Sequence, residues 1–109
     1  YYNLVVVAYD LNHTNEKAIG TINALALNAT DQFNIRSVLL TSNSAQDADA
    51  FSKKMKLFTE VFYADAVPLK SMVRANPGVM LLKNGVIINK WHFNNLPSFD
   101  QLSEKYFSK

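Results

Sequence analysis

The sequence contains no cysteine. This absence excludes disulfides, thiol nucleophiles, cysteine-ligated zinc and iron–sulfur clusters, and dithiol redox chemistry. Glycine and proline are also scarce, with three of each among 109 residues, and the sequence has no repeat, low-complexity tract or linker. No hydrophobic run approaches the about 20 residues that a membrane-spanning helix needs, and no signal-peptide pattern opens the sequence.

Charge of either sign is sparse as well. Eleven basic and nine acidic residues give a net charge of +2, which is too small to indicate nucleic acid or an acidic membrane surface as a partner. Hydrophobic residues make up 49% of the sequence, so we expect one compact domain over residues 1–109. The first residue is Tyr1 rather than methionine, from which we expect the domain to be a fragment of a longer protein.

Apolar runs and helical patterns predict nine elements in the order β-α-β-α-β-α-β-β-α. The valine-rich run at residues 4–9 is typical of a strand in the middle of a sheet, buried on both faces. A helix at about residues 14–29 follows, and Asn12, His13 and Thr14 are the candidates for its cap. The other predicted elements are a strand at 35–41, a helix at 44–55, a strand at 60–63, a short helix near Pro68, strands at 79–83 and 86–91, and a last helix capped by Ser98.

The last two strands flank Asn84 and Gly85, a dipeptide that fits a type I′ hairpin turn. The element order, with Pro77 directly before this hairpin and a closing helix, resembles the thioredoxin superfamily. Its TlpA/peroxiredoxin-like branch carries an extra helix and strand, which residues 47–55 and 60–63 resemble. The resemblance implies a three-layer α/β/α sandwich with a mixed five-stranded sheet, and a cis peptide bond between Asn76 and Pro77.

The resemblance also indicates which residues of this sequence align with the CxxC motif of the superfamily. Aligning the first strand and its loop puts His13 and Glu16 at the two cysteine positions. Neither an imidazole nor a carboxylate can replace a thiolate that attacks a disulfide. The resemblance therefore implies a redox scaffold without its redox centre, so the chain is not expected to be a thiol–disulfide oxidoreductase.

A narrower resemblance covers residues 72–85 and 89–92. These residues are similar to the soluble C-terminal domain of DoxX/MauE-like membrane proteins of Bacteroidetes. This implies a membrane anchor in a segment outside the chain and a neighbourhood associated with redox proteins. It favours a periplasmic location, with the cytoplasmic face of the membrane as the alternative.

The loop at residues 10–16 is the first candidate site. It lies between the carboxyl end of the central strand and a helix N-terminus, where open α/β sheets bind ligands and exposed N–H groups favour anions. Asp10, Asn12, His13 and Glu16 are its candidate ligand-binding residues. The nitrogen and oxygen atoms of Asp10, His13 and Glu16 could also hold a metal. The alternative is an ordinary polar connection, and no metal or other cofactor is assigned to it.

The second candidate site is the segment of Asn76, Pro77 and Gly78, since this part of the family scaffold pairs with extended peptides. The alternative is that the proline only ends the preceding helix and starts the hairpin. Aromatic residues lie at the start of the chain, at Tyr1 and Tyr2, and at the end of the last strand, at residues 91–93. They favour either an interface or packing beneath a helix. The small basic cluster of Lys53, Lys54 and Lys56 is interpreted as a solvated helix face.

Three functions remain open. The leading one is a non-catalytic module that binds a protein partner or supports its own membrane portion. The second is an enzyme, or a metal- or small-ligand-binding domain, that uses Asp10, His13 and Glu16. The third is a structural homodimerisation domain, which predicts an exposed apolar patch at a sheet edge or on the outer helices.

Overall fold

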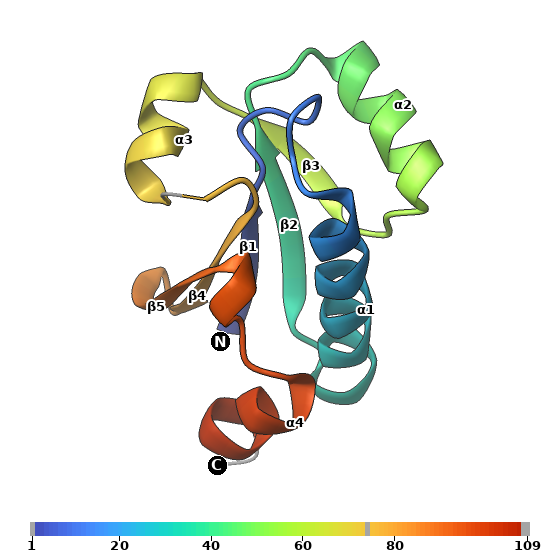
Figure 1. Cartoon of the computed structure of the whole chain (residues 1–109). Helices are drawn as coiled ribbons and strands as arrows, with labels where there is room; N and C mark the ends of the chain where they lie inside the picture. Colours follow the sequence, from blue (N-terminus) through green and yellow to red (C-terminus); the bar gives the residue numbers. More distant parts are fainter. Residues whose placement is uncertain (1, 74, 108–109) are drawn as a thin grey trace.

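The computed structural model describes residues 2–73 and 75–107, and its five strands form one mixed sheet in the order β3-β2-β1-β4-β5 (Figure 1). The strands are β1 (Tyr2–Val7), β2 (Arg36–Thr41), β3 (Glu60–Tyr63), β4 (Gly78–Lys83) and β5 (Val86–His92). β1 pairs in parallel with β2, which pairs in parallel with β3. β4 is antiparallel to both β1 and β5. The predicted order of elements and the mixed sheet are confirmed.

Helices cover both faces of the sheet and complete three layers (Figure 1). They are α1 (Glu16–Phe33), α2 (Ala45–Met55), α3 (Ala66–Met72) and α4 (Phe99–Leu102), the last followed by a π-helical turn (Ser103–Phe107). α1, α2 and α4 pack on the face of β1 that carries Leu4 and Val6. α3 packs on the opposite face, which carries Val5 and Val7. Within the described residues, none of the helices has both the length and the apolar character needed to cross a membrane.

The central strand is shifted from its predicted position. β1 covers Tyr2–Val7, whereas the apolar run predicted residues 4–9. Its residues from Leu4 onward are buried, as the run predicts. Pairing determines the boundary, because Tyr2 already lies opposite Lys83 of β4 and the strand ends where Val7 meets Gly78.

The ends of α1 also differ from the prediction. Asn15 is the cap, since its side-chain Oδ1 accepts a hydrogen bond of 3.0 Å from the N–H of Ala18, so the assignment of the cap to Asn12, His13 or Thr14 is wrong. The helix continues to Phe33, four residues past the predicted end. Phe33 packs against Phe99 and Phe107, and these contacts come from the far end of the sequence.

The predicted hairpin turn and the predicted caps of α2 and α4 are confirmed. Asn84 and Gly85 have φ values of 53° and 83°, as a type I′ turn requires. Ser44 and Ser98 cap α2 and α4 through their side chains. The peptide bond between Asn76 and Pro77 is cis.

Candidate functional site

The loop between β1 and α1 is held by contacts within itself. Asp10 accepts a 3.0 Å hydrogen bond at Oδ1 from the N–H of Asn12, and its Oδ2 lies 2.7 Å from Nδ1 of His13. The hydrogen bond with His13 lowers the pKa of the Asp10 carboxyl, and desolvation opposes this shift only in part. The His13 side chain is 81% exposed. Asp10 and His13 thus form a surface pair that fixes the turn.

Asn76 fastens this loop to the segment around Pro77. Its side-chain Nδ2 donates a 2.7 Å hydrogen bond to the carbonyl oxygen of Asp10. Its own carbonyl oxygen accepts a 3.1 Å hydrogen bond from the N–H of Asn15. Asn76 therefore joins both ends of the loop to the start of β4, so the two predicted sites are one structural unit.

Pro77 and Gly78 are buried, which limits how this segment can meet a partner. Gly78 is paired with Val7 on one side and His92 on the other. The carbonyl of Asn76 is already bonded to the loop. The loop that Asn76 holds beside this segment presents the exposed side chains of Asn12 and His13.

Two residues that hold the loop in place, Leu11 and Asn43, were not identified from the sequence. The N–H of Leu11 donates a 2.9 Å hydrogen bond to Oδ1 of Asn43, and the side chain of Leu11 is buried. The hydroxyl of Thr41 donates to the same Oδ1 at 3.1 Å. The available signal was Leu11 itself, a large apolar residue inside an otherwise polar loop.

Glu16 does not join Asp10 and His13. Its Oε2 lies 2.7 Å from Nζ of Lys54, so it ties the start of α1 to α2. Across residues 2–73 and 75–107, no group of three or more histidine, aspartate or glutamate side chains is placed to hold a metal ion. The alternative of a three-residue metal site made by Asp10, His13 and Glu16 is therefore not assembled among the described residues. Lys54 also has a structural partner that its interpretation as part of a solvated face did not include.

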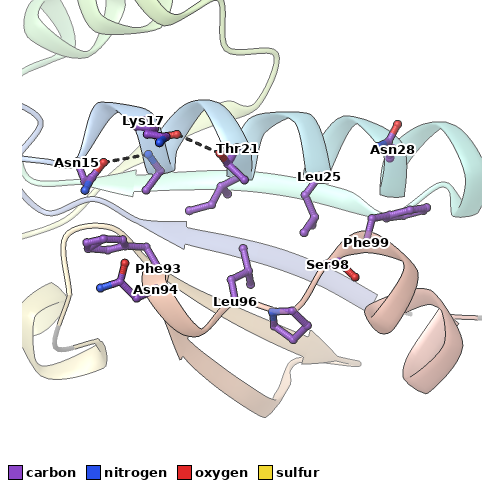
Figure 2. A pocket seen from close by; sticks show the side chains of 13 residues that line it. Asn15, Lys17, Thr21, Leu25, Asn28, Phe93, Asn94, Leu96, Ser98 and Phe99 are labelled. Carbon is purple, nitrogen blue, oxygen red and sulfur yellow. Dashed lines mark hydrogen bonds between the residues drawn. The ribbon is translucent and has the colours of Figure 1, made fainter.

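An open groove of about 630 Å³ begins beside the loop and follows α1 (Figure 2). One wall is α1 from Asn15 to Asn28, and the other is the chain from Phe93 to Phe99. Its interior is mainly apolar, and amides and hydroxyls lie along its rim. No local pattern in the sequence indicates this groove, because its second wall comes from a segment about 70 residues further along the chain.

The aromatic residues mostly pack. Trp91 is partly buried and makes an edge-to-face contact with Tyr106, at 6.5 Å between ring centroids. Tyr2 contacts Tyr106 and Phe107, whereas Tyr1 lies outside the described residues. The packing interpretation is confirmed for Trp91 and Tyr2. His92 is exposed, and its Nδ1 accepts a hydrogen bond from the N–H of Asn94.

An exposed apolar run lies on the edge strand β5. Val86, Ile87 and Ile88 are 64%, 45% and 39% exposed. Ile88 is the extra residue of a β-bulge, because Leu81 faces Asn89 while Leu82 faces Ile87. This is the kind of edge patch that a homodimerisation domain predicts.

The fold is similar to that of a solved structure described as a thiol:disulfide interchange protein DsbE from Chlorobium tepidum. The TM-score is 0.66 and the sequence identity 10%, and the match covers 84% of this chain and 67% of that one. No family model and no curated protein matches the sequence. The chain has a thioredoxin-like fold, as its element order predicted. At this identity the similarity concerns the fold alone.

Proposed function

We propose that this chain is a thioredoxin-like module that performs no thiol–disulfide exchange and binds a protein partner. The partner is either a separate protein or the membrane-embedded portion of the same polypeptide. The observation that carries the proposal is a thioredoxin-like fold with a cis-proline beside its strand–helix loop and no cysteine anywhere in the sequence. Function must be argued from the site, because a fold is shared by many activities.

In this proposal His13 and Glu16 stand where redox members of the superfamily, including its TlpA/peroxiredoxin-like branch, carry their two cysteines. Two placements support it. Glu16 is the first residue of α1 and His13 lies three residues earlier, in the loop that Asn76 fastens beside Pro77. A cysteine at a helix N-terminus has a lowered pKa, which is why this position suits thiolate chemistry.

Restoring the cysteines tests the positional assignment. We expect the double variant His13→Cys/Glu16→Cys to form an intramolecular disulfide and to reduce insulin in the presence of dithiothreitol, while the unmodified chain stays at background. The matched control places cysteines at Thr14 and Lys17, with the same spacing shifted by one residue. Equal activity of the two pairs would contradict the assignment, and activity of the unmodified chain would contradict the whole proposal.

Site-specific photo-crosslinking tests partner binding. A photoreactive residue at Asn12 lies on the exposed loop, and one at Lys53, whose side chain is 79% exposed, serves as the control on α2. In cells that make the natural full-length protein, we expect a discrete adduct from position 12 and none from position 53. An intramolecular adduct would identify the membrane portion as the partner. Adducts from both positions, or from neither, count against the proposal.

The membrane anchor is part of the same proposal. The similarity of residues 72–85 and 89–92 to DoxX/MauE-like proteins supports a tether outside the chain and a periplasmic location. We expect the natural protein to sediment with membranes, and this domain to be digested when protease is added to spheroplasts. Digestion only after lysis would place it on the cytoplasmic face instead.

Homodimerisation is the second candidate function, favoured by the exposed run from Val86 to Ile88 on an edge strand. Edge strands with apolar side chains readily pair with another chain. Light scattering would show a dimer that Ile87→Lys dissociates. A monomer at all concentrations would remove this candidate.

A further inference from the structure

The groove along α1 has the length of a short extended peptide. Its wall on α1 runs from Asn15 to Asn28 (Figure 2). At 1.5 Å per helical residue, this wall is about 20 Å long. An extended chain rises by about 3.3 Å per residue, so about six residues would fill the groove from end to end.

The interior of the groove suits apolar side chains, and its rim suits a peptide main chain. Ile22 and Leu25 of α1 line the groove, and Leu96 lies across from Leu25 (Figure 2). The side-chain amides of Asn28 and Asn94 make no hydrogen bond within the described part of the chain, and they lie toward opposite ends of the groove. An amide both donates and accepts, as a peptide group does.

The two ends of the groove differ in charge. Of the described residues that line the groove, Lys17 alone is charged, and it forms no ion pair with the others. It lies at the end where the dipole of α1 is positive. Beyond the other end, Asp31 follows Asn28 by three residues, which places the two on neighbouring parts of the helix surface. Asp100 directly follows Phe99 there, and the last turn of α1 carries no basic residue.

We propose that this groove binds an extended segment of a partner protein, about six residues long and apolar at its centre, with an acidic residue beside Lys17 and a basic residue toward Asp31 and Asp100. The inference rests on the proposed function, for which it supplies the place and the chemistry of the partner. Charge complementarity selects this occupant. Because the charges lie at a solvated rim, they determine direction and rate of binding more than affinity.

The probe is a six-residue peptide blocked at both ends, with lysine first, alternating leucine and valine, and glutamate last. Titrated into the ¹⁵N-labelled chain, it is expected to shift the amides of Thr21, Asn28 and Asn94. Lys17→Glu should weaken binding at least threefold, and a peptide that ends in lysine should recover it. Lys90→Glu, which makes the same charge change at an exposed position outside the groove, should leave binding unchanged.

A second pair of variants tests the space itself. Thr21→Trp places a large side chain in the groove and should abolish binding. Leu27→Trp makes a similar change at an exposed position of α1 outside the lining and should not. Binding that survives Thr21→Trp, or shifts confined to another surface, would overturn the inference. The inference would also be overturned if the amide signals did not shift at about 1 mM peptide, a concentration at which even weak binding is detected.

The remaining outcomes separate this inference from the proposed function. Concentration-dependent shifts of the groove amides without peptide would assign the groove to a second copy of the chain and overturn the inference. The photo-crosslink from Asn12 does not depend on the peptide. If that adduct persists in the Thr21→Trp variant, partner binding stands while the groove is excluded as its place. If the peptide binds the groove as described but the adduct is absent, the groove is shown to bind an extended segment, while the result counts against the proposed function in cells.

Discussion

Replacing Gly78 with alanine tests how tightly the segment around Pro77 is packed. Gly78 is buried and begins β4 directly after the cis peptide bond. A Cβ atom added there would lie 2.6 Å from the Cβ of Val73 and 2.8 and 2.9 Å from its two methyl carbons. Ordinary contacts of this kind fall between 3.4 and 4 Å, so the new atom overlaps its neighbours by several tenths of an ångström or more.

The overlap is difficult to relieve, because it involves more than a flexible side-chain end. Val73 is 6% exposed, and rotation about its χ1 moves the methyl groups but leaves the 2.6 Å contact with Cβ. Overpacking of this kind costs about 1–3 kcal/mol. Alanine regains about 0.4–1 kcal/mol by restricting the unfolded chain, since the φ of Gly78 is not in the left-handed region. We expect a net loss of roughly 1–2 kcal/mol, which lowers Tm by about 5–15 °C in a domain of this size.

Urea unfolding followed by circular dichroism measures this loss, and a double-mutant cycle assigns it. In the background of Val73→Gly, which removes all three contacting carbons, Gly78→Ala should cost less than about 0.5 kcal/mol. In the background of Val73→Ala, which keeps the Cβ, most of the cost should remain. Trimethylamine N-oxide keeps the weaker variants folded during the measurement. A Gly78→Ala variant as stable as the original, or an equal cost in all three backgrounds, would refute the packing argument.

Three further substitutions test other parts of the site and the core. Asn15→Ala should cost about 1 kcal/mol in urea unfolding because it removes the cap of α1, whereas Asn12→Ala should change stability by less than about 0.5 kcal/mol; equal effects would contradict the cap assignment. The pKa of Asp10 is lowered in the folded state, so its carboxylate adds stability at pH values above its unfolded pKa of about 3.9, and this stability is lost as the pH falls through the lower folded pKa. The difference in stability between the original chain and Asp10→Asn should therefore shrink below about pH 4. A constant difference down to about pH 2 would contradict this. Ser37→Ala should leave stability unchanged or slightly increased, because the buried hydroxyl of Ser37 has no partner in the described residues, and a loss above about 1 kcal/mol would show a bond that this geometry lacks.

The parts of the fold that were predicted correctly depend on residues close together in the sequence. The turn at Asn84 and Gly85 is specified by those two residues, and the caps at Ser44 and Ser98 by a side chain and an N–H three residues later. The order of elements follows in the same way from local apolar patterns. The cis bond before Pro77 was expected from the family resemblance, and it is present in the structure.

The parts that were missed depend on contacts between distant residues. The local sequence favours Asn12, His13 and Thr14 equally as the cap of α1, but the cap is Asn15. The N–H of Asn15 is hydrogen-bonded to the carbonyl oxygen of Asn76. Leu11 is held by Asn43, which lies 32 positions away. Glu16 turns toward Lys54, 38 positions away, rather than toward His13. No local pattern in the sequence contains these pairings, so the loop could be located but its internal geometry could not be predicted.

The internal contacts of the loop also bear on where a partner would bind. A loop that performs thiol exchange must present a sulfur to its substrate, whereas here Asp10 is paired with His13 and Glu16 with Lys54. The carbonyl of Asn76 is bonded within the chain as well. Among the described residues, the side chains of Lys17, Asn28 and Asn94 instead have no polar partner, and they lie around an apolar interior that starts where the loop ends. If the partner binds as proposed, the loop fixes the position of α1 while the groove beside it provides the recognition, and variants of Asn76 should weaken peptide binding only as far as they displace α1.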